Sequence, residues 1–263
     1  MKRNNILIIG SLFLIFFLLG AEFHYKEIFP YGSGIRDKLK FLKKSKKKNN
    51  EICANLEYRK REFKFFLTKV KSGGSIDHLI IGDSVADGAH SPKLFDLKYD
   101  IIATDAATVG CLVYFIDYVK DINPKNLIIY LGGNDADGQG IQSFNEASET
   151  YLEFIKNFKN KNENSKVYAL GVNIGVPWRR DNNFVINFNE LIKKGINELN
   201  SSDIKYIESF NGLNFEKSTR EEISKSKLSD NGLTYDGEHL KYQGYVEWFN
   251  YIDKKIENGI YNK

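Results

Sequence analysis

The sequence predicts an α/β domain of three layers, in which helices cover both faces of a mostly parallel sheet. Short apolar runs alternate along the chain with longer segments whose apolar residues recur every three or four positions. Most of the short runs are apolar without interruption, which is typical of strands buried on both faces. With 263 residues, of which 42% are hydrophobic and 27% charged, the chain is long enough for one such domain and an appendage.

Each expected element follows from one of these two patterns. The short runs predict strands at residues 78–81, 101–103, 127–131, 167–170 and 204–207. The amphipathic segments predict helices at residues 112–122, 144–158, 184–199 and 242–256. Alternation of this kind favours parallel strands joined by crossover helices, and ligands bind such sheets beyond the carboxyl ends of the strands.

The first 23 residues are expected to be a signal anchor or a signal peptide. Residues 6–21 form an apolar run whose only polar side chain is Ser11, and Lys2 and Arg3 precede it. Leu19 is not the small residue that a cut after Ala21 would require, so an uncleaved anchor is favoured. The basic start predicts a cytoplasmic N-terminus, which places the rest of the chain outside the cytoplasm in the cell envelope.

Residues 24–74 are expected to be a basic stalk that links the anchor to a domain at residues 75–263. The stalk contains a lysine-rich run at 36–48 and an amphipathic stretch at 56–70, and it ends at a serine- and glycine-rich break. The lysine-rich run explains a formal net charge of +4, and it can be a solvated tether or lie against anionic lipid or an acidic wall polymer. Because this run is tied to a membrane segment, nucleic acid is not expected as a partner.

Neither of the two cysteines predicts a metal site. Cys53 and Cys111 have no C-x-x-C or cysteine/histidine spacing that would hold zinc. We therefore expect no metal and no cofactor. A disulfide between them is one possibility outside the cytoplasm, and the spacing does not decide it.

Four short motifs together supply the groups that acyl transfer through a serine ester needs. They are Gly82-Asp83-Ser84, Gly110, Gly133-Asn134-Asp135 and Asp236-Gly237-Glu238-His239. Three of the motifs alone also have a structural interpretation: a turn at Ser84, a glycine-rich turn with a left-handed Asn134, and a structural histidine at His239. His239 has an acid, Asp236, three residues before it. The joint pattern favours a nucleophile, oxyanion donors, a general base and its carboxylate.

These motifs resemble those of the SGNH, or GDSL, hydrolase family over about residues 77–257. The resemblance implies a flavodoxin-like, three-layer fold. It makes Ser84 the nucleophile, His239 the base and Asp236 its orienting partner. It also makes Gly110 and Asn134 oxyanion donors, together with the backbone N–H of Ser84.

The chain departs from the family pattern at three positions. Val85 stands where the family name expects leucine. Asp105 stands where the family often has asparagine, and Val109 stands where serine often precedes the glycine. The assignment of Gly110 therefore rests on weaker sequence support than the others.

The function favoured by these observations is a membrane-tethered serine esterase that removes O-acetyl or other short acyl groups from a carbohydrate. The alternatives are acyl transfer to a sugar hydroxyl and a lipase or lysophospholipase, the latter disfavoured because no long apolar lid adjoins the motifs. Binding of a glycan without catalysis is disfavoured because all the catalytic residue types are present. Trp178, Arg179 and Arg180 follow the fourth strand and are candidate substrate contacts, by stacking on a sugar or pairing with an anion, or else part of a solvated loop.

Overall fold

The computed structural model describes residues 53, 60–90, 99–140, 142–175, 180–210, 233 and 239–261, and every structural statement below concerns these residues. The five strands are β1 (His78–Gly82), β2 (Asp100–Ala103), β3 (Asn126–Tyr130), β4 (Lys166–Leu170) and β5 (Ile204–Ile207). The longer helices are α3 (Lys60–Lys71), α5 (Leu112–Val119), α7 (Phe144–Lys159), α8 (Asn182–Glu198) and α10 (Tyr242–Tyr261). Two short helices, α4 (Ser84–Asp87) and α6 (Gly133–Ala136), begin close to the ends of strands.

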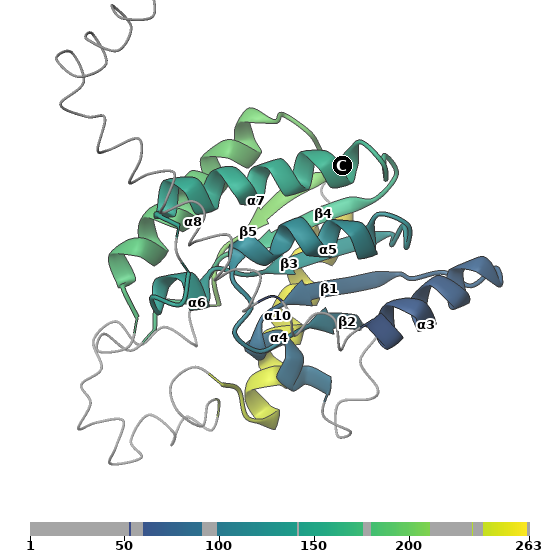
Figure 1. The fold of residues 1–263 in the computed structure, drawn as a ribbon, viewed down its shortest axis with the longest axis horizontal. Helices are drawn as coiled ribbons and strands as arrows, with labels where there is room; N and C mark the ends of the chain where they lie inside the picture. The colour runs from purple at the N-terminus through teal and green to yellow at the C-terminus, as the bar shows by residue number, and fades with distance from the viewer. Residues whose placement is uncertain are drawn as a thin grey trace, which may run out of the picture. The chain divides into compact units, whose positions relative to one another are not determined.

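The strands form one parallel sheet in the order β2-β1-β3-β4-β5 (Figure 1). The predicted parallel sheet is therefore confirmed. Gly82 at the end of β1 is level with Ala103 of β2 and Tyr130 of β3, so these three strands end at one edge. This order belongs to the flavodoxin-like type of doubly wound sheet, in which the strand order reverses between β1 and β3 and ligands bind at that point.

Alternate residues of each strand point into two separate cores. Leu79, Ile81 and Ile129 belong to a first core, which is covered by α3, α5, α7 and α8. Ile80 and Ile128 belong to a second core, which is covered by α4 and α10. Figure 1 shows α5 and α7 in front of the sheet and α10 behind it, which gives the three predicted layers.

The helices lie close to their predicted positions, and their ends have local causes. Ser143 begins α7 with a capping box, in which its hydroxyl accepts from the Glu146 N–H and the Glu146 carboxylate accepts from the Ser143 N–H. Asp181 caps α8 by accepting from the N–H groups of Asn183 and Phe184.

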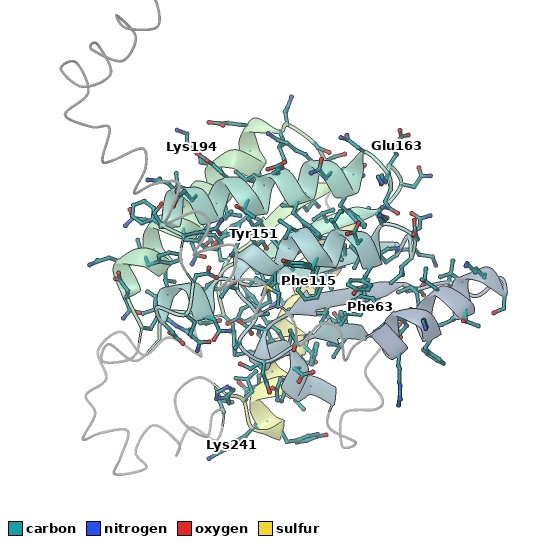
Figure 2. All side chains as sticks on the ribbon, viewed as in Figure 1. Phe63, Phe115, Tyr151, Glu163, Lys194 and Lys241 are labelled. Carbon is teal, nitrogen blue, oxygen red and sulfur yellow. A yellow bond between two sulfur atoms is a disulfide. The ribbon has the colours of Figure 1, made fainter. Side chains whose placement is uncertain are left out.

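The amphipathic stretch expected at residues 56–70 is seen as α3, and it packs against the domain. Phe63 is 1% exposed and stacks on Tyr118 of the first core, with ring centroids 3.9 Å apart. Figure 2 labels Phe63 together with Phe115 and Tyr151, all three of which are buried in this core. Cys53 is also buried there and forms a disulfide with Cys111. The core of the domain thus includes residues that the sequence assigned to the stalk.

The apolar run at residues 6–21 lies outside the described residues. Within the described part of the chain, no helix has both the length and the hydropathy needed to cross a bilayer.

Candidate active site

Ser84 is the first residue of α4, and one residue, Asp83, separates it from the end of β1. The carboxylate of Asp83 caps this helix by accepting from the Val85 N–H at 3.0 Å. The strand-to-helix turn is tight, since a Cβ on Gly82 would lie 2.5 Å from the Ala86 side chain. Ser84 itself is half-buried, so its hydroxyl is held at the edge of the sheet and is still reachable from solvent.

His239 lies beside Ser84 although the two are 155 positions apart in the sequence. The distance from His239 Nε2 to Ser84 Oγ is 3.2 Å. With the proton on Nδ1, Nε2 can accept the serine proton, which is the arrangement of a nucleophile and its general base. Leu240 and α10 place the histidine, because Leu240 is buried in the second core directly after it. Asp236, the predicted orienting carboxylate, lies outside the described residues.

Gly110 is buried in a single 3₁₀ turn, Val109–Cys111, between β2 and α5. Side chains of the third motif hold this turn from α6. The Asn134 amide donates from Nδ2 to the Ala107 carbonyl at 3.0 Å, and the Asp135 carboxylate accepts from the Val109 N–H at 2.8 Å. The second and third motifs are therefore in direct contact, as two contributors to one oxyanion site would be.

Asn134 lies in α6 and does not have the left-handed backbone that the structural interpretation required. The positive φ in this motif belongs to Gly132, at 126°, a conformation that favours glycine. Asn134 is 8% exposed. An asparagine amide has two N–H donors, and the contact with the Ala107 carbonyl uses one of them. The second donor is available to an oxyanion.

Asp135 is the most perturbed carboxyl group near the site. It is 6% exposed, and burial raises its pKa from 3.8 to about 7. The Val109 N–H lowers this pKa in part, and the charge of Asp137 raises it further. The group can therefore hold a proton at neutral pH. The sequence motifs assign Asp135 no role in catalysis, because its burial and its contact with Val109 are visible only in the structure.

Arg180 forms a buried ion pair with Asp137. Its Nε and Nη2 atoms form a forked contact with the Asp137 carboxylate at 2.8 and 3.2 Å, and Nη1 donates to the Asn173 carbonyl at 3.2 Å. Both side chains of the pair are buried, at 8% and 5% exposure. The pair fixes the turn that follows α6. The sequence did not indicate it, because Asp137 and Arg180 are 43 positions apart. Trp178 and Arg179 lie outside the described residues.

No cluster of three or more histidine, cysteine, aspartate or glutamate side chains suited to a metal ion occurs in the described ranges. The two cysteines are joined to each other. The contact between Ser84 and His239 is an arrangement that can carry out bond-breaking chemistry.

Comparison with known families agrees with this geometry. The family model described as GDSL-like lipase/acylhydrolase matches residues 78–252, which span every motif of the site. The chain belongs to this family. It is an ester hydrolase.

Solved structures share the fold of this GDSL-like hydrolase at low sequence identity. A GDSL-like lipase from Bacteroides thetaiotaomicron is 18% identical, with a TM-score of 0.59 over 78% of this chain and 98% of its own. A protein from Streptococcus pneumoniae is 15% identical, with a TM-score of 0.54 over 85% and 97% of the two chains. A candidate acylhydrolase from Bacteroides fragilis is 16% identical, with a TM-score of 0.54 over 70% and 87%. No curated protein sequence shows significant similarity to the chain.

Two departures from the family pattern have a clear place in the structure. Val85, in the leucine position, is buried in the second core and so replaces one apolar side chain by another. Val109, in the serine position, contributes its side chain to the first core and its N–H to Asp135. Asp105 is exposed, and the structure gives no reason for its replacement of asparagine.

Proposed function

We propose that this ester hydrolase is a membrane-tethered serine esterase that acts outside the cytoplasm and removes O-acetyl or other short acyl groups from a carbohydrate. The observation that supports the serine mechanism is the 3.2 Å contact between Ser84 Oγ and His239 Nε2. Ser84 lies just beyond the carboxyl end of β1, next to β3, where the strand order reverses. Acyl transfer through a serine needs this pair and donors for the oxyanion, and the donors lie on neighbouring elements.

In the first half of the reaction, Ser84 Oγ attacks the ester carbonyl carbon while His239 Nε2 takes its proton. The carbonyl oxygen becomes negative and accepts hydrogen bonds from the N–H groups of Ser84 and Gly110 and from the second N–H of Asn134. The bond to the alcohol then breaks, and the imidazolium of His239 gives its proton to the departing oxygen. An acyl group is left on Ser84.

In the second half, water replaces the alcohol. His239 removes a proton from the water as its oxygen attacks the acyl carbon, and the proton passes to Ser84 Oγ when the acid leaves. Asp236 is proposed to accept a hydrogen bond from His239 Nδ1, which would hold the required tautomer and stabilise the imidazolium.

The proposed location is supported at two places in the chain. The apolar run at residues 6–21 follows Lys2 and Arg3, a pattern of a membrane anchor with its N-terminus in the cytoplasm. The disulfide between Cys53 and Cys111 suits an oxidising compartment. An enzyme held at the membrane in this way would meet glycans of the envelope, and Trp178 and Arg179 are proposed to contact the sugar.

A substrate panel tests the chemistry. The full chain, in membranes or detergent, is assayed on aryl acetates, longer aryl esters and acetylated polysaccharides beside Ser84→Ala. Ser165→Ala is the control, because Ser165 is a buried serine that bonds the Pro124 carbonyl at the opposite end of the sheet. We expect release of acetate that Ser165→Ala keeps and Ser84→Ala loses. Equal rates in the parent and Ser84→Ala would contradict the proposal.

A second measurement tests the location. A reporter that is active only after export, fused after Lys263, should be active. Activity of a reporter that works only in the cytoplasm, at the same position, would reverse the topology.

A further inference from the structure

We propose that Asp135 is a positioning residue of the oxyanion site, which fixes the direction of the Gly110 N–H by holding the neighbouring N–H of Val109. The inference deepens the proposed function and rests on it, since Gly110 must be an oxyanion donor. The substrate does not need to touch Asp135 for this role.

The hydrogen bond from the Val109 N–H to Asp135 Oδ2, at 2.8 Å, fixes one side of Gly110. The other side is fixed at Cys111, whose N–H donates to the Thr108 carbonyl at 2.9 Å and whose sulfur is bonded to Cys53. Gly110 thus lies between two anchored neighbours. Because a glycine has the widest backbone freedom, the direction of its N–H depends on such anchors.

The loop that leads to this turn is not in a relaxed conformation. Ala106 has a φ of 58°, in the left-handed region that disfavours a side chain. A strained loop persists where its surroundings hold it, and here the holding groups come from the third motif. Asn134 bonds the Ala107 carbonyl and Asp135 bonds the Val109 N–H, so the two contacts hold the loop on both sides of Thr108.

The burial of Asp135 is costly for a purely structural residue. Its Oδ1 atom is buried and accepts no hydrogen bond from the described residues. Gly140 closes over this oxygen, since a Cβ at that position would lie 2.4 Å from it. An acid with one unsatisfied oxygen destabilises a fold, and such groups concentrate at functional sites. Gly140 is therefore part of the same arrangement, because it lets the chain pack against the carboxylate.

The test compares Asp135→Ala and Asp135→Asn in the full chain with Asn162→Ala. Asn162 is the matched control because it is a buried side chain, 2% exposed, that bonds the Phe158 carbonyl away from the site. Asparagine keeps an oxygen that can accept from the Val109 N–H, and alanine does not. We expect Asp135→Ala to lower kcat about 10- to 100-fold with KM changed less than about threefold, and Asp135→Asn to recover most of kcat.

Hydrogen exchange over residues 104–112 provides a readout that does not depend on activity. It should become faster in Asp135→Ala and stay unchanged in Asn162→Ala. If kcat of Asp135→Ala equals that of Asn162→Ala while Ser84 is required for activity, the positioning role is wrong and the proposed function stands. The role is also wrong if exchange over residues 104–112 is unchanged in Asp135→Ala. If the parent and Ser84→Ala hydrolyse esters equally, the proposed function fails, and the positioning role of Asp135 fails with it.

Discussion

The two halves of the site rest on opposite faces of the sheet and are held by different forces. Ser84 and His239 are carried by elements of the second core, where α4 and α10 pack through apolar and aromatic side chains. The Gly110 turn and α6 are carried by the first core and are held by buried polar contacts and a disulfide. Catalysis requires that both halves keep their positions relative to the sheet edge.

This difference predicts how substitutions in each half affect stability and rate. Volume-conserving changes in a packed apolar core usually cost less than about 1.5 kcal/mol, so the nucleophile half should tolerate modest changes of this kind. Buried polar contacts at 2.8 and 3.0 Å are directional, and losing one leaves a buried group unpaired. Substitutions of these polar groups should therefore lower stability by about 1 kcal/mol, and they should also lower the rate because the turn that contains Gly110 loses a contact.

The largest effect is expected at the nucleophile. Ser84→Ala should lower kcat by at least about 10⁴-fold, because no acyl-enzyme can form. The melting temperature should change little, since Ser84 is half-buried and its Oγ contacts only His239 among the described residues. Mass spectrometry after treatment with a serine-directed phosphonate should find the adduct on Ser84 in the parent. An adduct on another serine would assign the nucleophile elsewhere.

Loss of the disulfide should chiefly affect stability. Cys53→Ala opens a loop with a sequence separation of 58 residues. In the chain-entropy model this lowers the free energy of unfolding by about 4 kcal/mol. Denaturant titration with and without reductant measures it: the oxidised parent should be more stable than the variant, and reductant should remove the difference. Equal midpoints for the oxidised parent and the variant would contradict the disulfide.

Asn134→Ala tests the oxyanion half directly. Removing the donor should cost about 3 to 4 kcal/mol in the transition state, or roughly 100- to 1000-fold in kcat, with little change in KM. Stability should fall by only about 1 kcal/mol, from the lost bond to Ala107. Asn189→Ala is the control, because Asn189 bonds both backbone groups of Val172 in a similar way outside the site. Normal kcat in a strongly destabilised Asn134→Ala would make Asn134 a structural residue.

The buried acid of the oxyanion half should make stability depend on pH. The pKa of Asp135 is raised to about 7 by burial, so the folded state binds this proton more tightly than the unfolded state. Its contribution to stability is full below pH 3.8 and is lost as pH rises through about 7. Asp135→Asn cannot ionise, so its stability relative to the parent should improve between pH 5 and pH 8. A constant difference over this range, in denaturant titrations, would contradict the raised pKa.

The smallest effect is expected when one buried tyrosine on each face of the sheet is replaced. Tyr245 donates from its hydroxyl to the Val85 carbonyl at 2.8 Å, and Tyr151 donates to the Ile129 carbonyl at 3.1 Å. Each change to phenylalanine should cost about 1 kcal/mol of stability. Only Tyr245→Phe should slow phosphonate labelling of Ser84, because Val85 belongs to α4. Equal labelling rates in the two variants would show that this bond does not position the nucleophile.

The strands and most helices could be predicted because their signals are local. Residues 79–81 and 127–129 are continuous apolar runs, and the structure places them as adjacent buried strands. The start of the domain was less visible. The pattern of α3 showed an amphipathic helix, but the surface against which Phe63 packs comes from α5, some 50 positions further on.

The local sequence was enough to predict the fold class, the family and the candidate residues Ser84, Gly110, Asn134 and His239, because each lies in a short motif directly after a predicted strand or before a predicted helix. The groups that hold these residues were seen only in the folded chain. The bond between Val109 and Asp135, the Asp137–Arg180 pair and the disulfide join positions 26, 43 and 58 residues apart. Contacts at such separations depend on how the chain crosses the sheet, and no local periodicity encodes them.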